Sequence, residues 1–95
     1  MEITFDPAKN ERNIRERGIS LERATDFNFE TAIYVQDSRK DYGETRIRAF
    51  EFIGDRLHAL VITVRGTALR IISLRKANRR EVERYEKAAK PGNDR

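Results

Sequence analysis

The sequence predicts an α+β domain with a mainly antiparallel sheet of about four to five strands. Three observations support this prediction. Apolar residues alternate with polar ones over several short runs, as in half-buried strands. Two Gly-X dipeptides separate three of these runs, as in tight hairpins. Two other segments carry helix start and stop signals. The expected order of elements along the chain is β-α-α-β-β-β-β-α.

A strand over residues 2–5 and a helix over residues 7–17 are expected to begin the chain. Asp6 is a good N-cap residue, and Pro7 fits the first helical position, where its missing N–H costs nothing. Gly18 follows as a helix-ending residue. The residues of this helix that are expected to face the core are Ala8 and Ile14, with the stem of Lys9.

A second short helix is expected from Ser20 to about Asp26. Phe27 and Phe29 follow it as core anchors. Residues 31–35 alternate as a strand, and the polar, turn-rich stretch 37–43 is expected to be a loop.

Three consecutive strands are expected over residues 44–53, 56–65 and 68–75. Gly54-Asp55 and Gly66-Thr67 connect them, and glycine in the first turn position is typical of type II′ hairpins. Two-residue turns fix the register, so that residues 53 and 56 face each other, as do 65 and 68.

A final helix is expected from Asn78, with Glu81 completing a capping box. Val82, Tyr85 and Ala89 share one face of this helix, and Pro91 ends it. We expect residues 1–90 to form a single domain and residues 91–95 a disordered tail.

The predicted register gathers polar side chains into rows across the sheet. Glu51, His58 and Arg75 form one row at a sheet rim. A second row joins Arg46, Thr63 and Arg70, and Glu44, Arg65 and Ala68 lie next to it. Leu74 is expected beside Ala59 and Phe50. These residues share a face with the Arg46 row. The other face, which has the Glu51–His58–Arg75 row at one end, is expected to carry Ile47, Ile53, Leu60, Ile62, Val64, Leu69 and Ile71. A one-residue bulge would break either set of rows.

Each row permits a functional and a structural interpretation. His58 between a carboxylate and a guanidinium suits general acid–base catalysis, or belongs to a structural row of ion pairs. The arginine row suits a phosphate clamp, or pairs internally with Glu44. Cations at the start of the last helix oppose its dipole and favour an external anion, or are solvated and paired within the helix; these are Lys76, Arg79 and Arg80. Tyr85 is a core residue with a solvated hydroxyl, or a catalytic phenol.

Charge is divided unevenly along the 95 residues. Residues 1–45 hold 7 basic and 10 acidic residues, whereas residues 46–95 hold 13 basic and 6 acidic ones. Fifteen of the 20 basic residues are arginine, a fork-shaped donor suited to phosphates. This basic half suggests a polyanion or an acidic protein partner. Both sheet faces are apolar at their middle, so any uncovered area would also bind a partner.

Several classes of chemistry are not expected. The chain has no cysteine, which excludes disulfides, thiol nucleophiles and zinc–thiolate sites. No glycine-rich phosphate loop, serine nucleophile motif or metal-ligand spacing is present, so no metal or cofactor is expected. No apolar run approaches the ~20 residues of a membrane span, and no signal-peptide pattern is present. We therefore expect a cytoplasmic protein.

Four segments resemble the BrnT-type toxins. They are ITFDPAKNERNI (3–14), GETRIRAF (43–50), IGDRLHALVITVRG (53–66) and RIISLRKANRREVERYE (70–86), of which the last is the most specific. The resemblance implies a RelE-like fold and a ribonuclease toxin of a type II toxin–antitoxin pair. It also implies neutralisation by a BrnA-like antitoxin in a 2:2 heterotetramer that binds operator DNA only through the antitoxin. The positions that match the family's polar signature are Arg65, Arg70, Arg75, Lys76, Glu81 and Tyr85.

One position departs from the family pattern. The first helix of such toxins usually ends in Lys-His-Gly, whereas this chain has Glu16-Arg17-Gly18. Arginine stays protonated and cannot act as a base, so His58 would have to take the place of a catalytic histidine, or activity would be lower.

The leading hypothesis is a metal-independent endoribonuclease that cleaves RNA and arrests translation. In this hypothesis Arg65, Arg70 and Arg75 stabilise the transition state, while His58, Glu81 or Tyr85 handles protons. The residues expected to bind RNA are Arg46, Arg70, Lys76, Arg79 and Arg80. The alternative is a non-catalytic interaction protein or corepressor that binds an antitoxin or nucleic acid.

Overall fold

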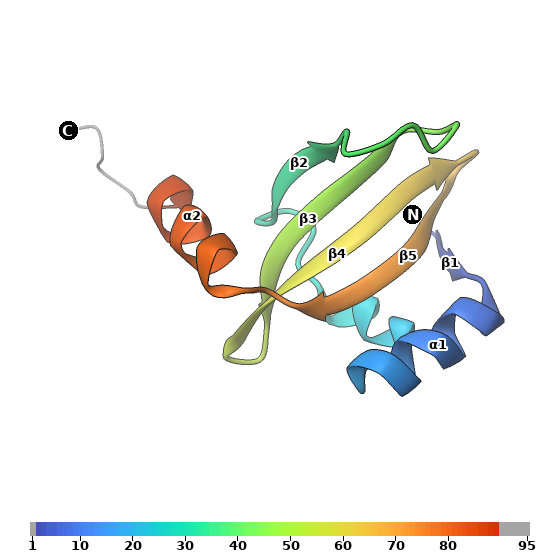
Figure 1. Ribbon diagram of the computed structural model, residues 1–95, viewed down its shortest axis with the longest axis horizontal. Helices are drawn as coiled ribbons and strands as arrows, with labels where there is room; N and C mark the ends of the chain where they lie inside the picture. Colours follow the sequence, from blue (N-terminus) through green and yellow to red (C-terminus); the bar gives the residue numbers. More distant parts are fainter. Residues whose placement is uncertain (1, 90–95) are drawn as a thin grey trace.

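The computed structural model describes residues 2–89 as an α+β fold around one five-stranded sheet (Figure 1). The strands are β1 (Glu2–Phe5), β2 (Ile33–Asp37), β3 (Arg46–Ile53), β4 (Arg56–Arg65) and β5 (Ala68–Lys76). The helices are α1 (Pro7–Arg17), the 3-10 helix η1 (Leu21–Asp26) and α2 (Arg79–Ala89). The predicted class and order of elements are confirmed. The expected tail, 91–95, lies outside the described residues.

The sheet has the order β1-β5-β4-β3-β2. Its three central strands are joined by hairpins, and only β1 runs parallel to its neighbour, β5. Gly54 and Gly66 have φ angles of 67° and 61°, which the first position of a type II′ turn requires. In both hairpins the pairs next to the turn, Ile53 with Arg56 and Arg65 with Ala68, are the predicted ones.

One β-bulge changes the register of the second hairpin. Ile62 faces Ile71 as predicted, but Val61, one residue farther from the hairpin turn, faces Ser73 instead of Ile72. Every pair farther from the turn than Val61 is shifted by one residue in the same way. The expected neighbours of Leu74 are therefore wrong. Leu74 lies opposite Leu60 and is fully buried with it in the main core. The bulge therefore reverses which face each side chain of β5 occupies from this point on.

Helix α1 begins and ends where its sequence predicts. The Asp6 carboxylate accepts a hydrogen bond from the Ala8 N–H (2.9 Å), and Gly18 ends the helix in the left-handed conformation. The expected core residues of α1 are wrong, however. Ala8 is exposed and Ile14 is 46% exposed, whereas Asn13 is the buried residue of the helix.

Asn13 is buried because it pairs with an open strand edge. β1 covers β5 only as far as Ile71, so on this side the backbone of Leu74 has no neighbouring strand. The Asn13 amide donates to the Leu74 carbonyl (2.8 Å), and its oxygen accepts from the Leu74 N–H (3.3 Å). It also donates to the Ile19 carbonyl (2.8 Å). One side chain thus satisfies buried backbone groups that would otherwise destabilise the fold.

The two faces of the sheet are covered differently. Helices α1 and η1 lie against one face, which we call the helix-covered face (Figure 1). Its fully buried side chains are Leu21, Ala24, Ala49, Leu60, Ile71 and Leu74. On the opposite face, α2 packs over a smaller cluster through Val82 and Tyr85; its members are Phe50, Leu57, Ala59 and Ala77. No described helix is long and apolar enough to cross a membrane.

Strand β2 spans residues 33–37 and not the expected 31–35, because a turn at Asn28 takes up the preceding residues. Its last residue, Asp37, is buried. Both carboxylate oxygens of Asp37 accept hydrogen bonds from Arg39, each at 2.8 Å. These hydrogen bonds lower the pKa of Asp37 to about 2.

Replacing Asn13 with alanine is expected to lower the free energy of unfolding by about 2–4 kcal/mol, because two buried backbone groups of Leu74 lose their partner. Urea denaturation measures the loss. Ile14→Ala, on the same helix, is expected to cost less than about 1 kcal/mol because Ile14 is half exposed. A larger loss for Ile14→Ala than for Asn13→Ala would contradict this account of α1.

Asp37 is expected to make stability depend on acid pH. Its folded pKa of about 2 lies below its ordinary value of 3.8, so its stabilising effect is present above pH 4 and disappears as the pH falls towards 2. Asp37→Asn is expected to cost about 1–2 kcal/mol at pH 6, allowing for solvent around the exposed Arg39, and almost nothing at pH 2. Thermal unfolding from pH 2 to 6 tests this; a pH-independent difference would refute it.

Candidate functional site

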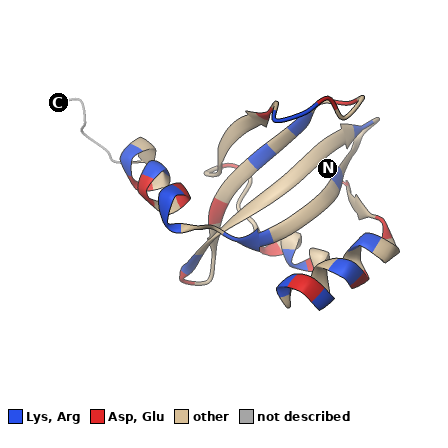
Figure 2. Ribbon diagram, in the orientation of Figure 1, with Lys and Arg blue, Asp and Glu red and all other residues tan. Residues whose placement is uncertain are grey.

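Five arginines share the sheet face opposite α1 and η1, which we call the arginine face. Strand alternation and the observed pairing put the side chains of Arg46, Arg48, Arg65, Arg70 and Arg75 on this face. Figure 2 shows basic residues along β3, β5 and the adjoining α2. Helix α2 covers only one end of the arginine face, next to Phe50 and Ala59. Most of these arginines thus lie on a surface that the described helices leave open.

The centre of the site is a two-bond ion pair between Arg75 and Glu81. Both guanidinium–carboxylate hydrogen bonds measure 2.8 Å. The side chains are 24% and 11% exposed, so the pair is partly shielded from water. Hydrogen bonding to Glu81 raises the pKa of Arg75, and the same bonds keep the pKa of Glu81 below its ordinary value. Glu81 is therefore an ionised carboxylate at neutral pH.

Glu81 also fixes the start of α2. Its carboxylate accepts from the Asn78 N–H, and its own N–H donates to the Asn78 side chain, both at 2.9 Å. The predicted capping box is confirmed. One carboxylate therefore joins the end of β5 to the first turn of α2.

Of the predicted row, the pairing of Glu51 with His58 is confirmed, but the place of Arg75 in it is wrong. After the bulge, His58 pairs with Lys76, and Arg75 pairs with Ala59 on the other face. His58 is buried among the residues of the helix-covered face, and its Nδ1 lies 2.8 Å from the Arg56 carbonyl oxygen. Burial, together with nearby cations such as Arg23, lowers the pKa of His58. The structure therefore separates His58 and Lys76 from Arg75 and Glu81.

Glu51 instead contacts Tyr85 by turning over a strand edge. β2 begins opposite Phe50, so the edge of β3 beside Glu51 is unpaired. The Glu51 carboxylate accepts hydrogen bonds from the Phe52 N–H (3.0 Å), the Tyr85 hydroxyl (3.0 Å) and the Thr31 hydroxyl. Burial alone would raise the pKa of Glu51, but these donors outweigh it and lower the pKa.

Tyr85 combines a packing contact with this hydrogen bond. Its ring packs edge-to-face against Phe52, with centroids 5.6 Å apart. Burial and the hydrogen bond to Glu51 raise the pKa of Tyr85, so the phenol stays protonated at neutral pH. Both predicted interpretations, core residue and reactive phenol, remain compatible with this position.

The second predicted row is present, at the far end of the arginine face. Thr63 pairs with Arg70 as expected. Glu44 forms ion pairs with Arg46 and Arg65, both at 3.2 Å, which is the internal pairing that was considered. The guanidinium of Arg46 also stacks over the ring of Tyr42, 4.1 Å from its centroid.

The cations at the start of α2 do not form one cluster. Arg79 forms a long ion pair with Glu83 (3.6 Å), and its side chain is almost fully exposed. Arg80 is also exposed, and Lys76 lies opposite His58 on β4. Of these three, Arg79 and Arg80 lie on the helix that carries Glu81.

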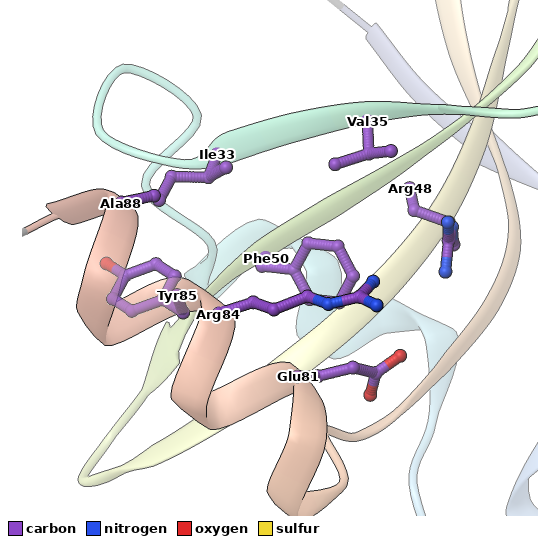
Figure 3. A pocket seen from close by; sticks show the side chains of 8 residues that line it. All are labelled: Ile33, Val35, Arg48, Phe50, Glu81, Arg84, Tyr85 and Ala88. Atoms are coloured by element: carbon purple, nitrogen blue, oxygen red, sulfur yellow. The ribbon is translucent and has the colours of Figure 1, made fainter.

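Arg48 and Arg84 are site residues that the sequence interpretation missed. Both line a cavity of about 160 Å³ between α2 and the arginine face, together with Glu81 and Tyr85 (Figure 3). The Nε atom of Arg48 is buried and has no hydrogen-bond partner among the described residues. Strand alternation could have predicted Arg48, because it places Arg48 on the same sheet face as Arg46 and Phe50. For Arg84, three residues after Glu81 on one helix, helical spacing gave a similar signal.

Comparisons with known proteins identify a family for this chain and a similar crystal structure. The family of the "ribonuclease toxin, BrnT, of type II toxin-antitoxin system" matches residues 5–81. A crystal structure of the ribonuclease toxin BrnT from Brucella abortus is similar, with a TM-score of 0.63 and 30% sequence identity. The match covers 83% of this chain and 99% of that one. A search of curated protein sequences gave no match.

The match to the family extends over most of the chain and includes Arg65, Arg70, Arg75 and, as its last residue, Glu81. The similar crystal structure has the same α+β class with a mixed sheet. This chain therefore belongs to the BrnT family of ribonuclease toxins of type II toxin–antitoxin systems.

Proposed function

We propose that the chain is a metal-independent endoribonuclease that cuts RNA at the Arg75–Glu81 pair and thereby arrests translation in the cytoplasm. The observation that carries this proposal is the position of the pair. It is a partly exposed, two-bond ion pair on a sheet face that bears four further arginines. A phosphodiester brought to this face meets a fixed guanidinium and an ionised carboxylate at once.

The reaction needs a base, a cationic clamp and an acid. The 2′-oxygen of RNA attacks the adjacent phosphorus while Glu81 accepts its proton. Arg75 stabilises the extra negative charge of the phosphorane. The bond from phosphorus to the 5′-oxygen then breaks, leaving a 2′,3′-cyclic phosphate and a 5′-hydroxyl. Tyr85, which is protonated at neutral pH and whose ring lines the same cavity as Glu81, releases its hydrogen bond to Glu51 and supplies the proton to the leaving oxygen.

His58 has no part in this proposal, although the sequence suggested it. It is buried on the helix-covered face, whereas the pair is on the opposite face. The remaining arginines of the arginine face, with Arg79 and Arg80 on α2, bind the RNA backbone. Arg65 at the far end serves binding in this scheme and not transition-state stabilisation, because its partner there is Glu44.

We further propose a BrnA-like antitoxin as the protein partner, in a 2:2 heterotetramer that contacts operator DNA only through the antitoxin. Membership of a toxin–antitoxin family supports a partner of this kind. So do exposed apolar side chains beside the site, Val35 at 41% and Phe52 at 43% exposure. Co-purification and light scattering would give the stoichiometry.

RNA cleavage is expected to continue in excess chelator. Arg75→Ala is expected to lower the cleavage rate at least about 100-fold, because the phosphorane charge loses its fixed donor. Arg12→Ala removes one positive charge from the exposed side of α1 and is expected to leave the rate within about threefold. Gel analysis of a labelled RNA measures both rates, and circular dichroism checks folding.

Three results would contradict the proposal. Cleavage that stops in chelator and returns with a divalent ion would remove its metal-independent part. Equal rates for Arg75→Ala and Arg12→Ala would remove Arg75 from the site. No cleavage by any variant, with growth unaffected on induction, would favour the non-catalytic interaction protein.

Glu81→Gln is expected to reduce cleavage about 100-fold or more while keeping α2 folded, because glutamine preserves the capping box but cannot accept the proton. His58→Gln is expected to change the rate less than about threefold. The pKa of Glu81 lies below its ordinary 4.5, so the wild-type rate should stay level as the pH falls to about 5 and decline only below that. A decline centred nearer 6, abolished by His58→Gln, would transfer the base to His58.

A further inference from the structure

The cavity between α2 and the arginine face has an apolar end and a charged end (Figure 3). Ile33 of β2 and Ala88 of α2 line the apolar end, Phe50 of β3 lies midway, and Val35 of β2 lies beside Arg48 (Figure 3). Arg48, Glu81 and Arg84 line the charged end, and Figure 3 shows the Arg84 side chain extended along the sheet towards that end. Tyr85 adds an aromatic wall.

The charges at this end do not cancel. Arg75 already neutralises Glu81 through two hydrogen bonds. Among the described residues, neither Arg48 nor Arg84 forms an ion pair with a carboxylate. The buried Nε of Arg48 also lacks an acceptor there. A buried donor without a partner is unfavourable, so this end is suited to an anion that supplies acceptor oxygens.

The size of the cavity limits what enters it. Its volume of about 160 Å³ is below the ~300–1,000 Å³ of pockets that enclose a whole drug-sized ligand. It suits one planar ring system between aliphatic and aromatic walls. A ring joined to an anion is the chemistry of a nucleotide, because a base stacks on aromatic side chains and its phosphate pairs with guanidinium groups.

We propose that this cavity holds one unstacked base of single-stranded RNA, with Arg48 and Arg84 on the phosphate of that nucleotide. The proposal rests on the proposed function and extends it to the substrate. Glu81 forms a wall of the cavity and pairs with Arg75, so the held nucleotide lies next to the phosphate to be cut. A base within a duplex is stacked and paired and does not enter such a slot. The cavity therefore selects unpaired RNA.

Calorimetric titration of the full chain with adenosine and uridine 3′-monophosphates tests this site. Inorganic phosphate and the free nucleosides serve as partial ligands. At least one nucleotide is expected to bind tenfold or more tightly than either of its parts. An acidic aromatic dipeptide, N-acetyl-Asp-Phe-amide, serves as a probe for a protein segment in the same cavity.

Three variants locate the binding. Ala88→Leu fills the apolar end from an exposed helix position and is expected to weaken nucleotide binding at least tenfold, with phosphate binding unchanged. Arg48→Met keeps the aliphatic stem and is expected to weaken both nucleotide and phosphate. Arg12→Met, on α1, is the matched control and is expected to weaken neither.

Several results would overturn the proposal. Phosphate that binds as tightly as every nucleotide would show that no base is held. Unchanged nucleotide binding in Ala88→Leu would put the base elsewhere. A dipeptide that binds more tightly than the nucleotides and displaces them would make the cavity a protein-binding site.

The same proteins are assayed for cleavage of a single-stranded RNA and of its duplex. The single strand is expected to be cut at least tenfold faster, and Ala88→Leu is expected to raise KM for it. A chain that binds nucleotides as described but does not cut RNA contradicts only the proposed function. A chain that cuts RNA but is unaffected by Ala88→Leu in both assays contradicts only the base-binding cavity.

Discussion

The β-bulge at the middle of β5 is the constraint on which the rest of the molecule depends. One extra residue at this point turns Leu74 into the main core and Arg75 onto the opposite face. The backbone of Leu74, beyond the reach of β1, is then bound by Asn13, which anchors α1. Arg75 meets Glu81, which caps α2. A single register shift therefore positions one helix on each face of the sheet and creates the ion pair of the site.

The two faces have different roles because they are covered to different degrees. Helices α1 and η1 bury the apolar side chains of one face, and that burial supplies most of the hydrophobic stabilisation. The opposite face keeps its arginines accessible, and most of the carboxylates near them are already in ion pairs. Much of the positive charge of the C-terminal half thereby lies on a surface that the described helices leave largely open.

Helix α2 forms part of the site more than part of the core. It contacts the sheet through Val82 and Tyr85 and is fixed by two polar contacts, Glu81 with Arg75 and Tyr85 with Glu51. The same two residues, Glu81 and Tyr85, line the cavity beneath it. Any movement of α2 would therefore change the shape of the cavity and the Arg75–Glu81 ion pair together.

The sequence alone determined the features that depend on neighbours in the chain. The Asp6-Pro7 start of α1, the Gly54 and Gly66 turns and the capping box of α2 each rest on bonds within a few residues, and all are confirmed. The segments that resemble BrnT toxins likewise lie in the sequence itself. Only the tertiary structure decided the rest. The bulge, the burial of Asn13, the separation of His58 from Arg75, and the position of Arg48 and Arg84 on one cavity all depend on packing between distant segments. Strand alternation and helical spacing do not specify where such segments come into contact, because one shifted residue reverses the faces of a strand.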